Sequence, residues 1–354
     1  MKKKVFICIL LFIFLENIFG EGYILIKYQG HYGLCDDDLN VILYPSNDKV
    51  CIVRDYIFVN KQNKCFIYDI NLNFISTINS GKISDIYYLY ENYYCIHSLF
   101  QDLIYNPVTQ YLKQIPEKIS TICFGAETIS FLPMYNKGYY FDIAGNIYLE
   151  DKSFEKVYPF IFGKAVVLQS DWTKGIIDID GNILLDGIIN CGWQFKDGLL
   201  PIITDYGSGF INDKMEFVYK CPIINEYKDI NVGGNPTLWC IYSEGYVYIH
   251  STNKIWEIRD TAGNIIAELP YNSESRMGFK DGLLPVIYNG KYGYIDVNGN
   301  VAISFVFDKA DDFDNGFANV CYCGKDSLVS TKSEVYYIED LIQKKKNPLL
   351  LNNQ

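Results

Sequence analysis

Three histidines, His31, His97 and His250, are the side chains of this chain best suited to metal binding or proton transfer at neutral pH. They are widely separated, whereas a zinc site needs three or four converging ligands, usually including a closely spaced pair. No G-x-S-x-G, H-E-x-x-H, P-loop or G-x-G-x-x-G pattern is present. We therefore predict no catalytic residue, no metal ligand and no cofactor-binding residue, and hence no cofactor.

The acidic segments have a simpler interpretation than metal binding. Asp178–Asn182 reads D-I-D-G-N and resembles the start of a calcium loop, but such a loop needs Gly at its sixth position and Glu at its twelfth. Those positions are Ile183 and Ile189, so we interpret the segment as a hairpin turn. Asp36–Asp38 and Asp311-Asp312 are interpreted as solvated loop charges.

The chain has 11 cysteines, of which Cys8 lies in an N-terminal apolar run and ten remain. An even number permits disulfides in an exported protein. Their spacing follows no compact framework, and most lie in apolar stretches where a free cysteine behaves as a small hydrophobic residue. We expect at most one or two disulfides, and no metal site at Cys321 and Cys323.

Aromatic residues are abundant and could form a contact surface. The chain has 31 Tyr, 22 Phe and 4 Trp. Exposed Tyr and Trp side chains bind proteins or stack on sugar rings, but aromatic residues also fill β cores. We expect the second role for Trp172, Trp193, Trp239 and Trp256.

The N-terminal twenty residues have the pattern of a secretory signal peptide. Lys2–Lys4 precede the apolar run Val5–Leu15, and Gly20 offers a small residue before cleavage at Glu21. The run is too short to cross a bilayer, which takes about 20 residues. We predict a signal peptide at 1–20 and a mature chain that is secreted, periplasmic or in the cell envelope, with no integral membrane segment after cleavage. An uncleaved anchor or a buried N-terminal strand is the alternative.

Internal repetition is the strongest signal in the sequence. Residues 22–36 align without a gap with residues 282–296, and FKDGLLP occurs at both 195–201 and 279–285. FDNG at 313–316 is a looser copy of its start. Such self-similarity is typical of repeat architectures, in which each unit buries its faces only by packing on its neighbours.

A D-x-x-G-N turn marks the period. It occurs at residues 142–146, 178–182, 260–264 and 296–300, and Gly or Asn after Asp accepts the positive φ of a tight hairpin turn. Degenerate copies begin at Asp36, Asp69, Asn106 and Asn212. Equivalent positions lie 33 to 37 residues apart, except for an interval of 49 between 214 and 263. This interval indicates an insertion near 230–258, with an extra strand at Tyr246–His250.

The repeats predict an all-β fold. We expect about eight antiparallel β-meander units of ~36 residues over residues 21–338, and a ninth, incomplete unit ending near Ser333. Each unit supplies three strands, or four in the first half. A propeller-like ring removes exposed sheet edges. We favour the ring because no polar capping unit is visible at either end, and an open β-solenoid is the alternative. Residues 339–354 would form a short helix and tail.

These motifs resemble a known family. The order G-K-Y-G-Y-I-D, x-x-G-N, a β-rich stretch and D-D-F-D-N-G-F-A is similar to the bacterial WG-repeat family. The match is best over residues 279–323, looser over 21–45 and 160–203, and poor over 46–135. Such a resemblance implies a β-rich repeat scaffold, often on exported or surface bacterial proteins, without a common catalytic residue.

The chain departs from this family at its diagnostic tryptophan. Tyr32 and Tyr292 stand in its place, and Lys174-Gly175 keeps only the glycine. The resemblance therefore supports the fold and leaves the function open.

Composition narrows the partner class. The formal charge is −11, from 31 basic and 42 acidic residues, which argues against nucleic acid as a partner. Only 8 residues are Ala, consistent with strands and not helices. We expect a non-catalytic binding or scaffold module for an unknown protein or glycan, or an envelope assembly component. The alternative is a carbohydrate-active hydrolase using paired carboxylates from neighbouring units, one with a raised pKa.

Overall fold

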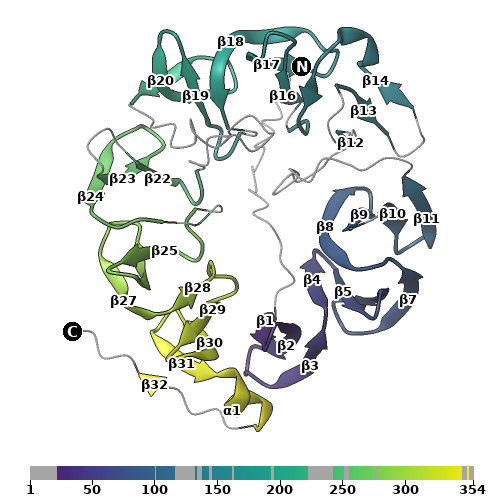
Figure 1. Ribbon diagram of the computed structural model, residues 1–354, viewed down its shortest axis with the longest axis vertical. Coiled ribbons are helices and arrows are strands. Elements are labelled where there is room, and N and C mark those ends of the chain that lie inside the picture. The colour runs from purple at the N-terminus through teal and green to yellow at the C-terminus, as the bar shows by residue number, and fades with distance from the viewer. Residues whose placement is uncertain are drawn as a thin grey trace, which may run out of the picture.

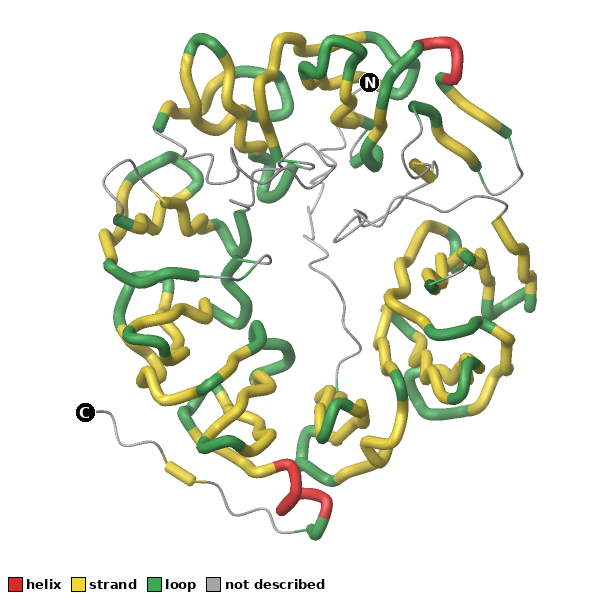
Figure 2. Tube along the Cα trace, in the orientation of Figure 1, coloured by secondary structure: helices red, strands yellow, loops and turns green. Residues whose placement is uncertain are grey.

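The computed structural model describes residues 22–344 and 349–350, apart from gaps at 100, 116–131, 134–137, 143–145, 162, 193–194, 222–241, 251–254, 274 and 276–277. The predicted signal peptide at 1–20 lies outside the described residues. Figure 1 shows small sheets following one another around a ring, with the first strand of a sheet near the centre and the last near the rim. Strands dominate the described chain (Figure 2).

Nine units can be traced among the described residues, each an antiparallel meander of three or four strands. Unit 1 contains β1 (Tyr23–Tyr28), β2 (His31–Asp36) and β3 (Val41–Asn47), and unit 2 contains β4 (Lys49–Val53), β5 (Tyr56–Lys61), β6 (Lys64–Asp69) and β7 (Phe74–Asn79). Unit 3 contains β8 (Ile83–Tyr90), β9 (Tyr93–Ser98), β10 (Asp102–Asn106) and β11 (Tyr111–Ile115). Unit 4 contains β12 (Leu132–Pro133), β13 (Tyr140–Phe141) and β14 (Ile147–Tyr148). A 3-10 turn, Glu150–Lys152, follows.

Units 5 and 6 share one strand. They contain β15 (Lys156–Val157), β16 (Lys164–Leu168), β17 (Lys174–Asp178), β18 (Ile183–Cys191), β19 (Leu200–Thr204), β20 (Gly207–Ile211) and β21 (Phe217–Lys220). β18 pairs with β17 from Ile183 to Ile188 and with β19 from Ile188 to Cys191, so the two pairings meet at Ile188. Gly187 has φ +67°, a left-handed conformation, and lies where the register with β17 shifts between Leu185 and Ile188.

Units 7 to 9 complete the ring. Unit 7 contains β22 (Tyr246–His250), β23 (Trp256–Asp260) and β24 (Ile265–Leu269), and unit 8 contains β25 (Leu283–Tyr288), β26 (Lys291–Asp296) and β27 (Val301–Phe307). Unit 9 contains β28 (Lys309–Ala310), β29 (Phe317–Tyr322), β30 (Lys325–Ser330) and β31 (Glu334–Tyr337), with β32 (Leu349–Leu350) added at the edge. The short helix α1 spans Ile338–Ile342. Tyr246–His250 is the first strand of a regular unit.

The D-x-x-G-N segments form the turn between the second and third strands of a unit. In unit 5, Asp178 Oδ1 accepts hydrogen bonds from the backbone N–H groups of Asp180 (3.0 Å) and Asn182 (2.8 Å). Its Oδ2 accepts one from Asn182 Nδ2 at 2.9 Å. Gly181 adopts φ +77°. The carboxylate therefore accepts the hydrogen bonds of the backbone N–H groups in the turn, and the glycine adopts the left-handed conformation that the turn requires. The same bonds recur at Asp260 and Asp296.

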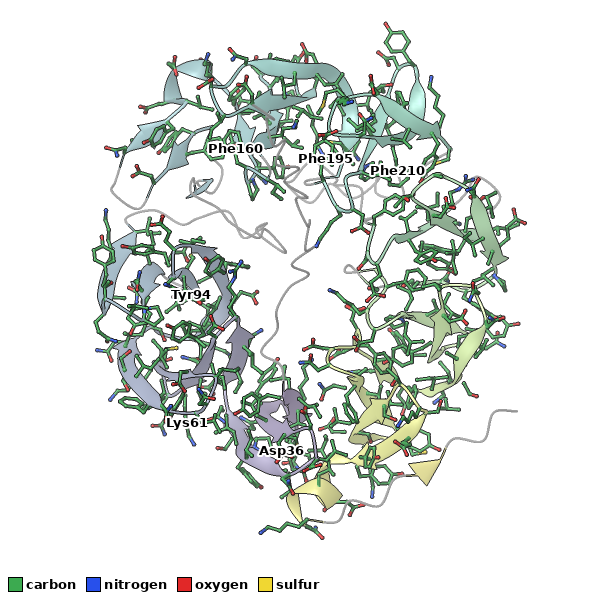
Figure 3. All side chains as sticks on the ribbon, turned by 180° about the vertical axis from the view of Figure 1, so that it is seen from behind. Asp36, Lys61, Tyr94, Phe160, Phe195 and Phe210 are labelled. Carbon is green, nitrogen blue, oxygen red and sulfur yellow. The ribbon has the colours of Figure 1, made fainter. Side chains whose placement is uncertain are left out.

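The hydrophobic core is divided among the seams between neighbouring units. Successive side chains of a strand point to opposite faces, so Tyr294 of β26 packs toward unit 9 and Ile295 packs toward unit 7. Each buried cluster accordingly joins side chains from two consecutive units, as at the seam where Tyr294 contacts Phe313. Figure 3 labels four of the buried aromatic residues that fill such seams: Tyr94, Phe160, Phe195 and Phe210.

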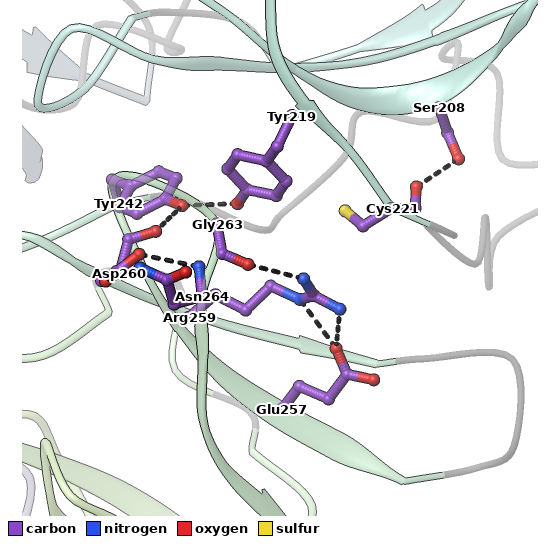
Figure 4. Close-up of polar contacts among 9 residues, drawn as sticks. All are labelled: Ser208, Tyr219, Cys221, Tyr242, Glu257, Arg259, Asp260, Gly263 and Asn264. Atoms are coloured by element: carbon purple, nitrogen blue, oxygen red, sulfur yellow. Dashed lines mark hydrogen bonds and ion pairs between the residues drawn. The ribbon is translucent and has the colours of Figure 1, made fainter.

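Tyrosine hydroxyl groups form hydrogen bonds across these seams. At the seam of units 6 and 7 the Tyr219 and Tyr242 hydroxyls are 2.5 Å apart, and Tyr242 donates to the Asp260 carbonyl at 2.7 Å (Figure 4). Beside them Arg259 pairs with Glu257 at 2.6 Å. Burial raises the pKa of both tyrosines, which keeps them protonated and able to donate.

The FKDG motif has a second role, which is to link units. Its turns place an acid before a left-handed glycine, and the acid accepts a hydrogen bond from the glycine N–H of the following unit. Asp197 thus accepts from Gly245 at 2.8 Å. Glu244 and Asp281 repeat the arrangement with Gly282 (2.8 Å) and Gly316 (2.7 Å). Consecutive units are therefore joined by polar contacts as well as by apolar packing.

The last unit closes onto the first. Asn319 of β29 accepts a hydrogen bond from Lys27 N (3.0 Å) and donates one to the Leu25 carbonyl (2.9 Å). Asp311 forms an ion pair with Lys27, so it is a seam residue and not only a solvated loop charge. Leu328 and α1 pack on the apolar face of β1 in a shared buried cluster. The all-β, propeller-like ring is thus confirmed, and the open solenoid is wrong because the ends meet.

No helix among the described residues has both the length and the apolar character needed to cross a membrane.

Candidate functional site

The three histidines lie in three different units. His31 begins β2 and is exposed, whereas His97 in β9 is buried with its Nδ1 2.5 Å from Asp102 Oδ1. His250 in β22 stacks on the Trp256 ring, with centroids 5.0 Å apart. Within the described residues no group of three His, Cys, Asp or Glu side chains could hold a metal ion.

The cysteines give no framework of disulfides in the described part of the chain. Free thiols are present at Cys51, Cys65, Cys191, Cys221, Cys321 and Cys323. Burial raises the pKa of the Cys191 thiol to about 11, which makes it a poor nucleophile. Cys123 and Cys240 lie outside the described residues, so the expectation of one or two disulfides stays a prediction about the remaining cysteines.

The clearest candidate site is a cavity of about 490 Å³ at the junction of units 5 and 6, which we call the β18 pocket. Three turns, the middle of β18 and residues of β19, β20 and β21 form it. The β16–β17 turn contributes Asp171 and Thr173, and the β19–β20 turn contributes Asp205 and Tyr206. The remaining lining residues are Leu185, Asp186 and Gly187 of β18, Ile202, Thr204, Ile211, Met215 and Phe217.

The pocket exists because of the way β18 changes units. Gly187 lies at the register shift between β17 and β18, and a Cβ there would meet no heavy atom within 4 Å. β18 pairs with β17 of unit 5 up to Ile188 and with β19 of unit 6 from Ile188 on, so residues from the β16–β17 turn and the β19–β20 turn line the same pocket.

Two strongly exposed aromatic side chains mark the turns that border the pocket. Tyr206 lines it and is 88% exposed, and Trp172, which lies between the lining residues Asp171 and Thr173, is 69% exposed. The expectation that Trp172 fills the core was therefore wrong. Trp172 lies at the tip of a hairpin, where it adopts φ +66° and its side chain is exposed. Trp256 does pack, stacking on Tyr248 at 4.9 Å. Trp193 and Trp239 lie outside the described residues.

The pocket has an apolar floor and an acidic rim. Ile202 and Ile211 are almost fully buried beneath it, and Leu185, Met215 and Phe217 pack on the same core cluster. Its three acids are exposed, and none of the lining residues is Lys, Arg or His. The site therefore combines apolar area with a negative potential.

The acids of the pocket are held differently. Asp171 accepts hydrogen bonds from Thr173 Oγ1 (2.7 Å) and Thr173 N (2.9 Å), and these bonds lower the pKa of its carboxyl. Asp186 Oδ1 accepts from Gln169 Nε2 (2.5 Å) and Gly187 N (2.7 Å). The Asp205 carboxylate makes no hydrogen bond or ion pair with any described residue. An Asp171 with a lowered pKa stays ionised, so it suits binding better than proton donation.

A second group of acidic side chains lies at the seam of units 8 and 9. Asp281 and Asp314 belong to neighbouring turns of the FKDG type. Desolvation and the negative charge of Asp281 raise the pKa of Asp314, although the Asp314 side chain remains exposed. Asp281 already accepts the inter-unit bond from Gly316. Asp312 beside them accepts a hydrogen bond from Ser275 Oγ at 2.6 Å, and burial raises the pKa of its carboxyl.

Fold and site together define a closed β-ring of repeated meander units that carries a shallow pocket. Residues 292–325, which run from β26 into β30, match the model of the WG containing repeat family, and the resemblance to that family is confirmed there. No curated protein matches the sequence.

Solved structures share the fold at low identity. A crystal structure of the eukaryotic initiation factor is 10% identical, with a TM-score of 0.57 over 93% of this chain and 95% of that one. AztD from Citrobacter koseri is 12% identical, with a TM-score of 0.42 over 93% and 95% of the two chains. BamB from Moraxella catarrhalis is 12% identical, with a TM-score of 0.32 over 78% and 77%. The first of these supports the all-β ring and says nothing of function.

Proposed function

We propose that this chain is an exported, non-catalytic binding protein that presents the β18 pocket to a protein or glycan partner. The observation that carries the proposal is the pocket itself, an apolar-floored cavity that is lined by the exposed Tyr206 and by the two neighbours of the exposed Trp172 in its turn. Large aromatic side chains left in water at a pocket mouth are typical of contact residues, because they bury much area at little entropic cost.

A binding role also agrees with the construction of the ring. The seams are filled by packed side chains and by the inter-unit bonds from Asp197, Glu244 and Asp281, so the turns stand on a firm scaffold. Binding residues on turns held by a rigid framework are a common arrangement in proteins.

The test is a parallel screen of the mature protein on a glycan array and a peptide array. The variant Trp172→Ala/Tyr206→Ala removes the two bordering aromatics, and Tyr44→Ala, a 55% exposed tyrosine in β3, is the matched control. We expect ligands whose signal falls about tenfold in the double variant and stays within about twofold in the control. Ligands that bind all three proteins equally would contradict the proposal.

Export is tested separately by the intact mass of the protein isolated from its native source. A chain that begins at Glu21 supports cleavage of residues 1–20. A chain that retains Met1 contradicts it.

The alternative, a carbohydrate-active hydrolase, is favoured by one observation, the raised pKa of Asp314 next to Asp281. A panel of fluorogenic glycosides tests it. We expect no turnover by the wild-type protein. Turnover that disappears in both Asp314→Asn and Asp281→Asn, and persists in Asp38→Asn, would replace the binding proposal with the enzymatic one.

A further inference from the structure

The charge of the β18 pocket points to a narrower class of ligand. Asp171, Asp186 and Asp205 line it from two turns and from β18, and no basic side chain lines it. The nearby Lys174 is buried below, where its Nζ donates to Asn190 Oδ1 (2.8 Å) and the Cys191 carbonyl (3.4 Å). The Lys174 ammonium group is therefore already hydrogen-bonded to a side chain and to a backbone carbonyl of β18.

The three carboxylates retain capacity for a ligand. An ionised carboxylate offers about four lone-pair positions, and the bonds described for Asp171 and Asp186 use only some of them. Asp205 has all of its positions available with respect to the described residues. Donors brought by a ligand would thus meet acceptors that the protein leaves exposed.

The floor and the border add two requirements that a simple cation does not meet. Leu185, Met215 and Phe217 line the pocket with apolar area on which an aliphatic side-chain stem can pack. Tyr206 lines the pocket and offers an aromatic face, and the exposed Trp172 lies in the turn between the lining residues Asp171 and Thr173. Cationic groups bind favourably to such aromatic faces. Lys and Arg side chains combine an apolar stem with a cationic head, which is the complement of this pocket.

We propose that the β18 pocket binds an Arg or Lys side chain on an exposed segment of a protein partner. This inference rests on the proposed function of the pocket as a binding site and specifies its ligand. The formal charge of −11 for the whole chain would also speed the encounter with a basic surface. A glycan without a cationic group would place only neutral hydroxyls against the three carboxylates. It would therefore gain less electrostatic binding energy from the pocket than an Arg or Lys side chain.

The proposal is tested with a positional-scanning hexapeptide library, in which one central residue is fixed at a time, followed by labelled peptides measured by fluorescence anisotropy. We expect the library signal to concentrate on fixed Arg and Lys. Replacing that Arg by citrulline, which keeps its shape without its charge, should weaken binding about tenfold, and added salt should weaken the Arg peptide alone.

Variants locate the effect. Asp205→Asn and Asp186→Asn should each weaken binding of the Arg peptide about three- to tenfold, whereas Asp38→Asn, an exposed acid in unit 1, should leave it within about twofold. Thermal unfolding of each variant shows that its fold is kept.

The remaining outcomes separate this inference from the function beneath it. Equal binding of the citrulline peptide, or no effect of Asp205→Asn, overturns the cationic ligand. If a neutral peptide or a glycan then binds in a way that Trp172→Ala/Tyr206→Ala abolishes, the binding function stands with another ligand. If no library member and no glycan binds, both proposals fall.

Discussion

The Tyr219 ring of unit 6 lies against Gly263 in the D-x-x-G-N turn of unit 7, so closely that a Cβ at Gly263 would stand 2.4 Å from the ring. Gly181 and Gly299 meet the preceding unit in the same way, through Leu149 and Ala267. The turn glycine therefore serves two purposes: it takes a positive φ, and it leaves room for the neighbouring unit.

Gly263→Ala should destabilise the ring more than the loss of backbone freedom alone explains. The left-handed conformation costs a non-glycine residue about 1 kcal/mol, and the overlap with Tyr219 adds about 1 to 3 kcal/mol. Gly290→Ala is the matched control, because Gly290 has φ +76° and open space around it. Urea unfolding of the two variants measures the difference, and equal losses would show that the seam contact is unimportant.

Asn319→Ala should weaken the closure of the ring. The Asn319 side chain bonds both Lys27 N and the Leu25 carbonyl, and its removal strips two backbone groups of β1 of their partners. We expect a loss of about 1 to 3 kcal/mol and faster amide exchange in β1. Asn71→Ala, an exposed side chain without a hydrogen bond to the described residues, should change neither. Unchanged exchange in β1 of the Asn319 variant would contradict the closure.

Lys174→Met should stabilise the protein at neutral pH. Burial lowers the pKa of Lys174 below its ordinary 10.5, so at neutral pH the fold carries the cost of a buried charge. Met keeps the stem, and Asn190 Oδ1 still accepts from Cys191 N. We expect a gain of about 1 kcal/mol in the free energy of unfolding.

The pH dependence of this gain has a definite sign. The unfolded state binds the proton more tightly, so wild-type stability rises with pH between the folded pKa and 10.5. The advantage of Lys174→Met should therefore shrink as the pH increases toward 10.5. Unfolding measured from pH 7 to 10 checks this, and an advantage that stays constant would mean that Lys174 is not the source.

Asp178→Asn should flatten the acid limb of the stability curve. Hydrogen bonds from the Asn182 side chain and backbone lower the folded-state pKa of Asp178 below its ordinary 3.8. Its stabilisation is therefore present above that value and lost as the pH falls through the folded pKa. Denaturant unfolding between pH 2 and 6 should show a shallower loss in this variant than in Asp180→Asn, whose exposed carboxylate makes no hydrogen bond to the described residues. Parallel curves would contradict the prediction.

Local features of the fold could be predicted from the sequence, because their causes lie within a few residues. The bonds of Asp178 to Asn182 span four positions, and the repeated Asp and Gly residues make the turn and its period visible. Ring closure could not be predicted in this way, because Asn319 and Lys27 are 292 positions apart. The choice of a ring over a solenoid depended on general arguments about exposed sheet edges and about the lack of a polar capping unit at either end.

The β18 pocket was missed for a related reason. Its lining residues come from three turns and from the strands β18 to β21, and no spacing rule joins Asp171 to Tyr206. One local signal was available: Trp172 stands in the polar run Gln169–Thr173 between two apolar strands, where a turn would expose it. Composition favoured the core for every tryptophan, and that argument took no account of the turn.

Chemical-shift mapping of backbone amides during titration with the tightest array ligand tests the central claim most directly. We predict shifts clustered at Gly187, Tyr206 and Gly207, around the β18 pocket, and no shift at Gly290 or Gly324 of the distant turns. Shifts confined to those distant turns, with Gly187 and Gly207 unmoved, would place the binding surface elsewhere and contradict the assignment.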